Sequence, residues 1–346
     1  MKIALIHLKY VKKGGMESYL FDLIEGFHDA EIDIFTLKID NKTPKNNNCN
    51  LIQNSFFLLP KLLKRFLFNR HVGSKFTPSN YDLSISLSRT SPQHITVCGG
   101  THKGFLKHFK HRLSLKDRLE IYHEKRSYTE AKQIIAHSHM LADEIIELYG
   151  IDSKKVHLIY PPINTQVFRS ELKKDSVELK KKWNLDPKKT TILFPSTGHE
   201  RKGWSELSKA MRLLQEDDSI ELVVAGNSVK AGSPNIRSLG FVHNMAELYA
   251  AVDYTILPAH YEPFGLVVAE SLQCQTPVIL SKFVGALELC TDAEAIVIDA
   301  ITPQQIVAAI RKAHKERKLV EPLFAERNGL TIPEHIKQIN QLANYG

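Results

Sequence analysis

The apolar positions of this chain form short runs that alternate with amphipathic segments, a pattern typical of parallel α/β sheets. A first series of runs predicts strands at residues 2–8, 31–37, 82–87, 95–98, 131–137 and 156–159. A second series predicts strands at 190–196, 220–226, 239–242, 254–258 and 276–280. Segments with helical spacing include 121–129, 140–149, 171–189, 205–215, 245–251, 265–274, 304–318 and 333–345. The pattern therefore predicts an α/β protein with two successive parallel sheets.

Length and composition agree with two ordinary globular domains. The chain has 346 residues, of which 43% are hydrophobic and 24% are charged, and domains typically run to about 100–200 residues. Its four cysteines are scattered, so they indicate neither a disulfide framework nor a zinc site. The start of the chain has the pattern of a first strand rather than a signal peptide, and no apolar run is long enough to span a bilayer. We expect a cytoplasmic protein.

The positive charge is concentrated in the first half of the chain. Residues 1–165 carry 24 Lys/Arg against 16 Asp/Glu, whereas residues 166–346 carry 22 of each. This asymmetry predicts an anionic partner for the first half: a phosphorylated acceptor, an acidic membrane surface or nucleic acid. Nucleic acid is disfavoured because no known binding module is present.

Two basic segments with interleaved apolar residues carry most of this prediction. Residues 56–70 could form a helix lying on anionic lipid, or a core helix with solvated lysines. Residues 103–118 contain six Lys/Arg and one acid, and are expected to form an acceptor or membrane surface; a merely solvated basic helix is the alternative.

Candidate chemistry begins with two carboxylates eight positions apart, Glu262 and Glu270. Glu262 lies in the loop after a predicted strand, and Glu270 lies on the following helix, where open α/β sheets bind ligands. The amides near Phe264, Gly265 and Leu266 open that helix and are suited to oxygen-rich ligands. Glu270 could accept hydrogen bonds from a vicinal diol such as a ribose. The alternative is a βα turn with two solvated glutamates.

Three further groups follow predicted strands. Arg201 and Lys202 are adjacent cations in a glycine-bounded loop. Such a pair is suited to binding a diphosphate; the alternative is plain surface charge. Gly14-Gly15 would let a phosphate approach a helix N-terminus, although such a pair can also be only a tight turn. His102 follows the predicted strand 95–98 and is a candidate site residue or a structural histidine. There is no G-x-G-x-x-G or P-loop motif.

The stretch Glu262-Pro-Phe-Gly-Leu-Val-Val-Ala-Glu270 resembles the E-x7-E signature of retaining glycosyltransferases of family 4. Arg201-Lys202-Gly203 resembles the family's R-K-G donor loop, and residues 131–164 resemble the segment ahead of its interdomain hinge. The resemblance covers nearly the whole chain and is strongest over residues 131–290.

The resemblance implies a GT-B fold: two Rossmann-like domains facing each other across a cleft, with a C-terminal helix crossing back. The expected parts are an acceptor-binding domain at 1–164, a nucleotide-sugar-binding domain at 165–330 and a tail helix at 331–346. It implies catalytic roles for Arg201, Lys202, Glu262 and His102, and no metal. The implied donor contacts are Gly14, Gly15, Gly198, Val242, Phe264, Gly265, Leu266 and Glu270.

The function that the resemblance implies is retaining transfer of a hexose from a nucleotide-sugar, with a UDP-sugar favoured, to a lipopolysaccharide-core or other cell-envelope glycan. Such an enzyme would lie peripherally on the inner face of the cytoplasmic membrane. The alternatives are a nucleotide-sugar epimerase on the same fold and a non-catalytic nucleotide-sugar-binding protein.

Overall fold

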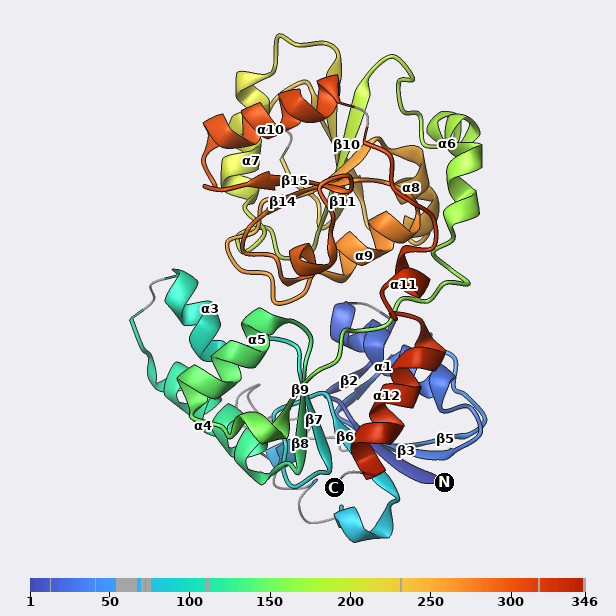
Figure 1. Ribbon diagram of the computed structural model, residues 1–346, viewed down its shortest axis with the longest axis vertical. Helices are drawn as coiled ribbons and strands as arrows, with labels where there is room; N and C mark the ends of the chain where they lie inside the picture. The colour runs from blue at the N-terminus through green and yellow to red at the C-terminus, as the bar shows by residue number, and fades with distance from the viewer. Residues whose placement is uncertain are drawn as a thin grey trace. The chain divides into compact units, whose positions relative to one another are not determined.

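The chain forms two compact units (Figure 1). The computed structural model describes residues 1–346 except 13, 41, 54–66, 70–71, 73–75, 110–111, 231, 317 and 345–346. One unit is Met1–Pro162 together with Leu330–Gly346, and the other is Ile163–Gly329. The boundaries expected from the sequence, after residues 164 and 330, fall within two residues of these. The predicted basic helix at 56–70 lies outside the described residues except for 67–69.

The first unit is built on seven parallel strands in the order β5-β3-β1-β6-β7-β8-β9. The strands are β1 (Lys2–Ile6), β3 (Glu31–Thr36), β5 (Cys49–Gln53), β6 (Leu83–Ser86), β7 (Ile95–Cys98), β8 (Gln133–Ala136) and β9 (Val156–Leu158), and β2 (Lys9–Tyr10) pairs separately with β4 (Lys38–Ile39). The order reverses between β1 and β6, so loops after these strands diverge there, as in doubly wound ligand-binding folds.

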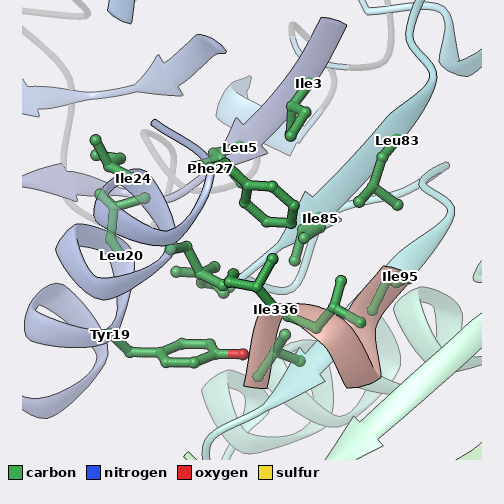
Figure 2. Close-up of a cluster of buried hydrophobic side chains, with 14 of the residues drawn as sticks. Ile3, Leu5, Tyr19, Leu20, Ile24, Phe27, Leu83, Ile85, Ile95 and Ile336 are labelled. Carbon is green, nitrogen blue, oxygen red and sulfur yellow. The ribbon is translucent and has the colours of Figure 1, made fainter. Parts of the chain in front are cut away.

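Strand β1 is covered on both faces, which explains its unbroken apolar run. Ile3 and Leu5 join the cluster beneath α1 (Gly15–Gly26) and α12 (Ile332–Asn344) (Figure 2). Ala4 and Ile6 pack on the opposite face with a separate cluster. Other helices among the described residues of this unit include α3 (His102–Phe109), α4 (Leu115–Glu130) and α5 (His139–Asp143), with 3₁₀ turns at Pro78–Asn80 and Ser153–Lys155.

The helix predicted at 140–149 is not uniform. It begins as α5, with Ser138 accepting a hydrogen bond from the Leu141 amide at 3.2 Å, which confirms the predicted cap. From Glu144 to Leu148 it continues as a π-helical turn. The sequence pattern carries no signal for this change of winding.

The tail helix belongs to the first unit because its apolar stripe completes that unit's core. Ile336 and Ile339 are buried in the same cluster as the residues of α1. A Cβ on Gly26 would lie 2.3 Å from Ile336, so the close approach of the two helices requires glycine there.

A buried polar contact also joins α1 and α12. The Tyr19 hydroxyl lies 2.8 Å from His335 Nε2, and the Tyr19 ring stands edge-on to His137 with centroids 5.1 Å apart. Burial lowers the pKa of His137 to about 3 and that of His335 to about 4. Both imidazoles are therefore neutral in the folded protein at neutral pH.

The second unit repeats this topology with six parallel strands in the order β12-β11-β10-β13-β14-β15. They are β10 (Thr190–Ser196), β11 (Ile220–Gly226), β12 (Ile236–Gly240), β13 (Tyr254–Leu257), β14 (Val278–Ser281) and β15 (Ala295–Ile298). The helices are α6 (Ser176–Lys182), α7 (Trp204–Leu213), α8 (Met245–Ala251), α9 (Leu266–Gln273), α10 (Pro303–Lys315) and α11 (Phe324–Arg327), with 3₁₀ turns at Ser170–Asp175 and Gly285–Leu289. Here the order reverses between β10 and β13.

The segment predicted at 171–189 as a charged helix and a turn contains α6 as its helix. A 3₁₀ turn precedes α6, and the helix ends because Asn184 adopts a left-handed φ of 51°. The Leu185 amide then bonds back to the Lys180 carbonyl at 2.8 Å, a closure typical of helix C-termini. None of the helices in the described part of the chain is long and apolar enough to cross a membrane.

The two buried histidines predict acid sensitivity of the folded state. Below pH 6.5 these two histidines are protonated in the unfolded chain but stay neutral in the folded protein. The free energy of unfolding therefore falls as the pH is lowered, until the pH reaches the pKa values of the folded state. Between pH 7 and pH 5 each should cost about 2 kcal/mol of unfolding free energy, measurable by urea denaturation. His335→Gln should flatten this slope, whereas His28→Gln, at an exposed position, should leave it unchanged. An unaltered slope in His335→Gln would contradict the assignment.

Candidate functional site

The best-formed candidate site lies where the strand order reverses in the second unit. Residues 197–203 follow β10 and residues 258–265 follow β13, and a backbone hydrogen bond from the His260 amide to the Arg201 carbonyl, 3.0 Å, joins the two loops. This is the position at which open α/β sheets bind ligands.

Glycines allow both loops to turn into their helices. Gly203 caps α7 with φ +78°, and a Cβ there would lie 2.0 Å from the Pro258 carbonyl oxygen. Gly265 caps α9 with φ +97°. The predicted helix at 265–274 therefore begins one residue later, at Leu266, and Gly265 supplies the left-handed cap.

Glu262 is fixed by backbone contacts on the side of β14. Its amide donates to the Phe283 carbonyl at 3.0 Å, and its carbonyl accepts from the Gly285 amide at 2.9 Å. The side chain is buried and pairs with Arg201, with Nη1 3.0 Å from Oε2. The contact is an ion pair without an aligned hydrogen bond, since no group donates to that oxygen within the described residues. Arg201 Nη1 also donates to the Tyr261 carbonyl at 2.9 Å.

Glu270 and Lys202 extend this pair into a cluster of four charges. The Tyr249 hydroxyl donates to Glu270 Oε2 at 2.9 Å. Burial raises the pKa of Glu270 to about 7, although the Tyr249 hydrogen bond and the charge of Lys202 act in the opposite direction. Burial likewise lowers the pKa of Lys202, opposed by the charges of Glu262 and Glu270. Its ammonium group donates to the Pro195 carbonyl at 3.0 Å.

The structure therefore brings Arg201, Lys202, Glu262 and Glu270 together. Tyr249 was not predicted, because an aromatic residue within a helical segment is typical of a core position and gives no sign of a carboxylate partner. In this cluster Arg201 and Lys202 can donate hydrogen bonds to an anion. Glu262 and Glu270 can accept hydrogen bonds from hydroxyl groups.

The other predicted residues of this unit line the same edge of the sheet with different exposure. Gly198 is exposed, with no atom within 4 Å of a Cβ built there. Phe264 is buried and its carbonyl accepts from the Ala286 amide. Leu266 is the first residue of α9, where the Val268 amide donates to the Gly265 carbonyl at 2.8 Å. Val242 is buried just beyond the end of β12, so only its backbone is suited to a ligand.

His102, predicted as a site residue, opens α3 in the first unit. Its Nε2 lies 2.8 Å from Asp117 Oδ1, and its amide donates to the buried Glu124 at 2.8 Å. The contact with Asp117 orients the imidazole, and the catalytic role expected of His102 stays a prediction.

Gly14 and Gly15 stand at the start of α1, as predicted, but the turn holds a carboxylate. Gly14 has φ +110°, and a Cβ there would lie 2.5 Å from Glu17 Oε2. A negative side chain at this helix N-terminus disfavours a phosphate at the same point.

Among the described residues, no group of three or more His, Cys, Asp or Glu is arranged to hold a metal ion.

Comparison with known proteins places this chain among enzymes that handle sugars. Residues 13–167 match the family described as Glycosyltransferase Family 4, and residues 175–323 match Glycosyl transferases group 1. A probable transglycosylase of Burkholderia thailandensis is 30% identical over 97% of this chain and 94% of its own length.

Solved structures share the fold over almost the whole chain. A glycosyltransferase involved in lipopolysaccharide biosynthesis, WaaG, has a TM-score of 0.81 at 18% identity, covering 99% of this chain and 96% of that protein. HepE of Anabaena, in complex with UDP-glucose, has a TM-score of 0.77 at 16% identity, with complete coverage of both chains. Both similarities support two Rossmann-like domains of the GT-B type.

The two loop glycines predict opposite responses to one substitution. Gly203→Ala should destabilise the protein by a few kcal/mol, because its Cβ would strike the Pro258 carbonyl and its φ is left-handed. Gly198→Ala, five residues earlier in the same loop, should change the unfolding free energy by less than about 0.5 kcal/mol. If urea denaturation shows that both variants lose the same unfolding free energy, the loop does not have the contacts described here.

Proposed function

This chain belongs to glycosyltransferase family 4, of the GT-B type, and we propose that it is a retaining enzyme that transfers a hexose from a nucleotide-sugar. A UDP-sugar is the favoured donor, and a lipopolysaccharide-core or other cell-envelope glycan is the proposed acceptor. The observation that carries the proposal is the cluster of two cations and two carboxylates at the strand-order reversal of the second unit.

The proposed roles follow from these charges. Glu270 accepts hydrogen bonds from the ribose diol, and its ionised form is required because a protonated carboxyl accepts fewer of them. Arg201 and Lys202 bind the diphosphate and stabilise its growing charge as the sugar leaves. When Arg201 turns to the phosphate, Glu262 loses its cation and becomes an acceptor for a sugar hydroxyl.

Metal independence is part of this proposal. Two adjacent cations compensate the charge that a divalent ion neutralises in other transferases. Turnover that persists undiminished in excess EDTA supports it, and restoration of activity by Mg²⁺ or Mn²⁺ after chelation would overturn it.

Two substitutions test the donor site. Arg201→Ala should lower kcat by about 100–1,000-fold, as expected for loss of a group that stabilises the transition state. Glu270→Ala should chiefly weaken donor binding, seen as loss of the rise in Tm that UDP or a UDP-sugar gives the wild-type protein. Glu200→Ala, at the exposed residue beside Arg201, is the matched control and should behave as wild type.

Measurements of turnover and of the Tm shift also separate the transferase from the two alternative functions. An epimerase would interconvert the donor sugar without an acceptor, and a binding protein would show the Tm shift without turnover. Wild-type turnover by Arg201→Ala or Glu270→Ala would remove the assignment altogether.

We also propose that α3 and the start of α4 bind an anionic membrane surface. Leu115, Leu119 and Tyr122 form an exposed apolar stripe on α4, with exposed fractions of 79%, 52% and 59%. Arg112, Lys116 and Arg118 are exposed beside it. Lys103, part of the predicted basic surface, instead donates to the Leu148 carbonyl and lies 4.7 Å from the Tyr149 ring centroid, so it contributes little.

Replacing Leu115 and Leu119 by Gln should therefore weaken binding to vesicles of mixed phosphatidylcholine and phosphatidylglycerol by about a hundredfold or more, because each leucine that enters the membrane contributes roughly 1.5–3 kcal/mol. Val177→Gln, at an exposed apolar residue of the other unit, is the control for sedimentation with the vesicles. Undiminished sedimentation of the double variant would show that this stripe has another role.

A further inference from the structure

The cation loop, residues 197–203, is attached to strand ends on both of its sides. On the side of β13, the His260 amide donates to the Arg201 carbonyl at 3.0 Å, and Arg201 Nη1 donates to the Tyr261 carbonyl at 2.9 Å. On the opposite side, the side chain of His199 reaches the end of β11. The loop is thus held between β11 and β13.

The His199 imidazole bridges the ends of two neighbouring strands. Its Nδ1 lies 2.9 Å from the hydroxyl oxygen of Ser196, the last residue of β10, and its Nε2 lies 3.1 Å from the carbonyl oxygen of Asn227, the residue after β11. A carbonyl can only accept, so Nε2 carries the hydrogen in this contact. The Ser196 hydroxyl can donate to Nδ1 or accept from it, so both contacts can form whether the ring is neutral or protonated.

The two strand ends that His199 joins are themselves fixed to each other. The Asn227 amide donates to the Ser196 carbonyl at 3.0 Å, and the Asn227 side-chain amide donates to the Thr197 carbonyl at 2.8 Å. A Cβ on Gly226, which has φ +126°, would lie 2.0 Å from the Ser196 carbonyl oxygen, so this close approach requires glycine. His199 therefore bonds to a part of the sheet edge whose geometry is already set by the backbone.

The main chain carries this attachment from His199 to the two cations. The Trp204 amide donates to the His199 carbonyl at 3.0 Å, and the Lys202 amide donates to the Gly198 carbonyl at 3.3 Å. The His199 ring also packs near the rings of Phe194 and Trp204, with centroid distances of 6.3 and 6.1 Å. Both cations lie within the turn that these contacts close.

We propose that His199 is a positioning residue of the donor site, which holds Arg201 and Lys202 in place for the diphosphate by joining the ends of β10 and β11. The inference rests on the transferase function proposed above. The proposed ribose contact, Glu270, lies outside the cation loop, so a donor can bind while the loop is loosened. The growing charge on the diphosphate, in contrast, is stabilised fully only when both cations are already in place. Loss of the two hydrogen bonds should therefore lower kcat more than it weakens binding.

Two substitutions separate this role from a purely structural one. His199→Phe keeps a ring against Phe194 and Trp204 but removes both hydrogen bonds, whereas His199→Gln loses the ring and keeps an amide that can donate to the Asn227 carbonyl. Positioning predicts that His199→Gln retains more turnover than His199→Phe, although ring packing predicts the higher Tm for His199→Phe. A purely structural role predicts that turnover follows Tm.

Turnover is measured with the full chain, well below its Tm, as release of UDP from UDP-glucose, and binding is measured by calorimetric titration with UDP. His199→Phe should lower kcat by about tenfold or more, as expected for the loss of two hydrogen bonds, and should change the Kd for UDP by less than about threefold. Glu200→Gln, at the exposed neighbouring residue, is the matched control and should equal the wild type in both measurements.

Hydrogen exchange of the ligand-free protein tests the loop directly. In His199→Phe the amides of residues 198–204 should exchange about tenfold faster or more than in the wild type, while those of β13 stay unchanged. The inference is overturned if exchange in the loop is unchanged, if His199→Phe keeps the wild-type kcat, or if turnover of the two variants follows their Tm. A wild-type protein that binds none of UDP, GDP and ADP would instead defeat the proposed donor site, and the exchange data alone would then decide whether His199 holds the loop.

Discussion

The charge balance among Arg201, Lys202, Glu262 and Glu270 is the constraint on which the second unit's site depends. Burying any one of these groups alone would be costly, since partial burial already shifts Glu270 towards its protonated form and Lys202 towards its neutral form. Arg201 pairs directly with Glu262, whereas for Lys202 and Glu270 the attraction of the opposite charges only partly offsets the cost of burial. The proposed donor, a diphosphate with an attached sugar, would offer the same kinds of interaction in exchange and would leave no isolated buried charge.

The topology makes this arrangement possible. The two loops follow neighbouring strands, β10 and β13, at the point where the strand order of the sheet reverses. The left-handed glycines then let the chain turn directly into α7 and α9, which places the cations and Glu262 within a few ångströms of the strand ends. The first unit has the same strand order, but a carboxylate stands at its glycine turn. One topology thus presents cations in the second unit and hydrogen-bond acceptors in the first.

Much of this could be predicted from local sequence, and the misses share one cause. Most of the strands, the Ser138 cap and the E-x7-E and R-K-G loops have short-range signals, since burial on both faces and turn chemistry each leave a pattern within about ten residues. Strands β5 and β15 were not predicted, and the strand predicted at 239–242 lies at Ile236–Gly240. Tyr249 as partner of Glu270, the inward turn of Lys103 and Glu17 beside Gly14 have no such signal. Each depends on which side chains the folded chain brings into contact, and a lysine that bonds a carbonyl has the same sequence pattern as one in solvent.

By itself, the sequence determined the alternation of buried strands and amphipathic helices, the division into two sheets and the loops that carry the charged residues, because these follow from hydrophobic periodicity and from backbone freedom at glycine. Only the tertiary structure decided which charges compensate one another, which carboxylate shifts its pKa towards neutrality and which strand ends the His199 imidazole joins. Electrostatic energies and desolvation depend on distances of a few ångströms between residues far apart in the chain, and those distances are set by packing.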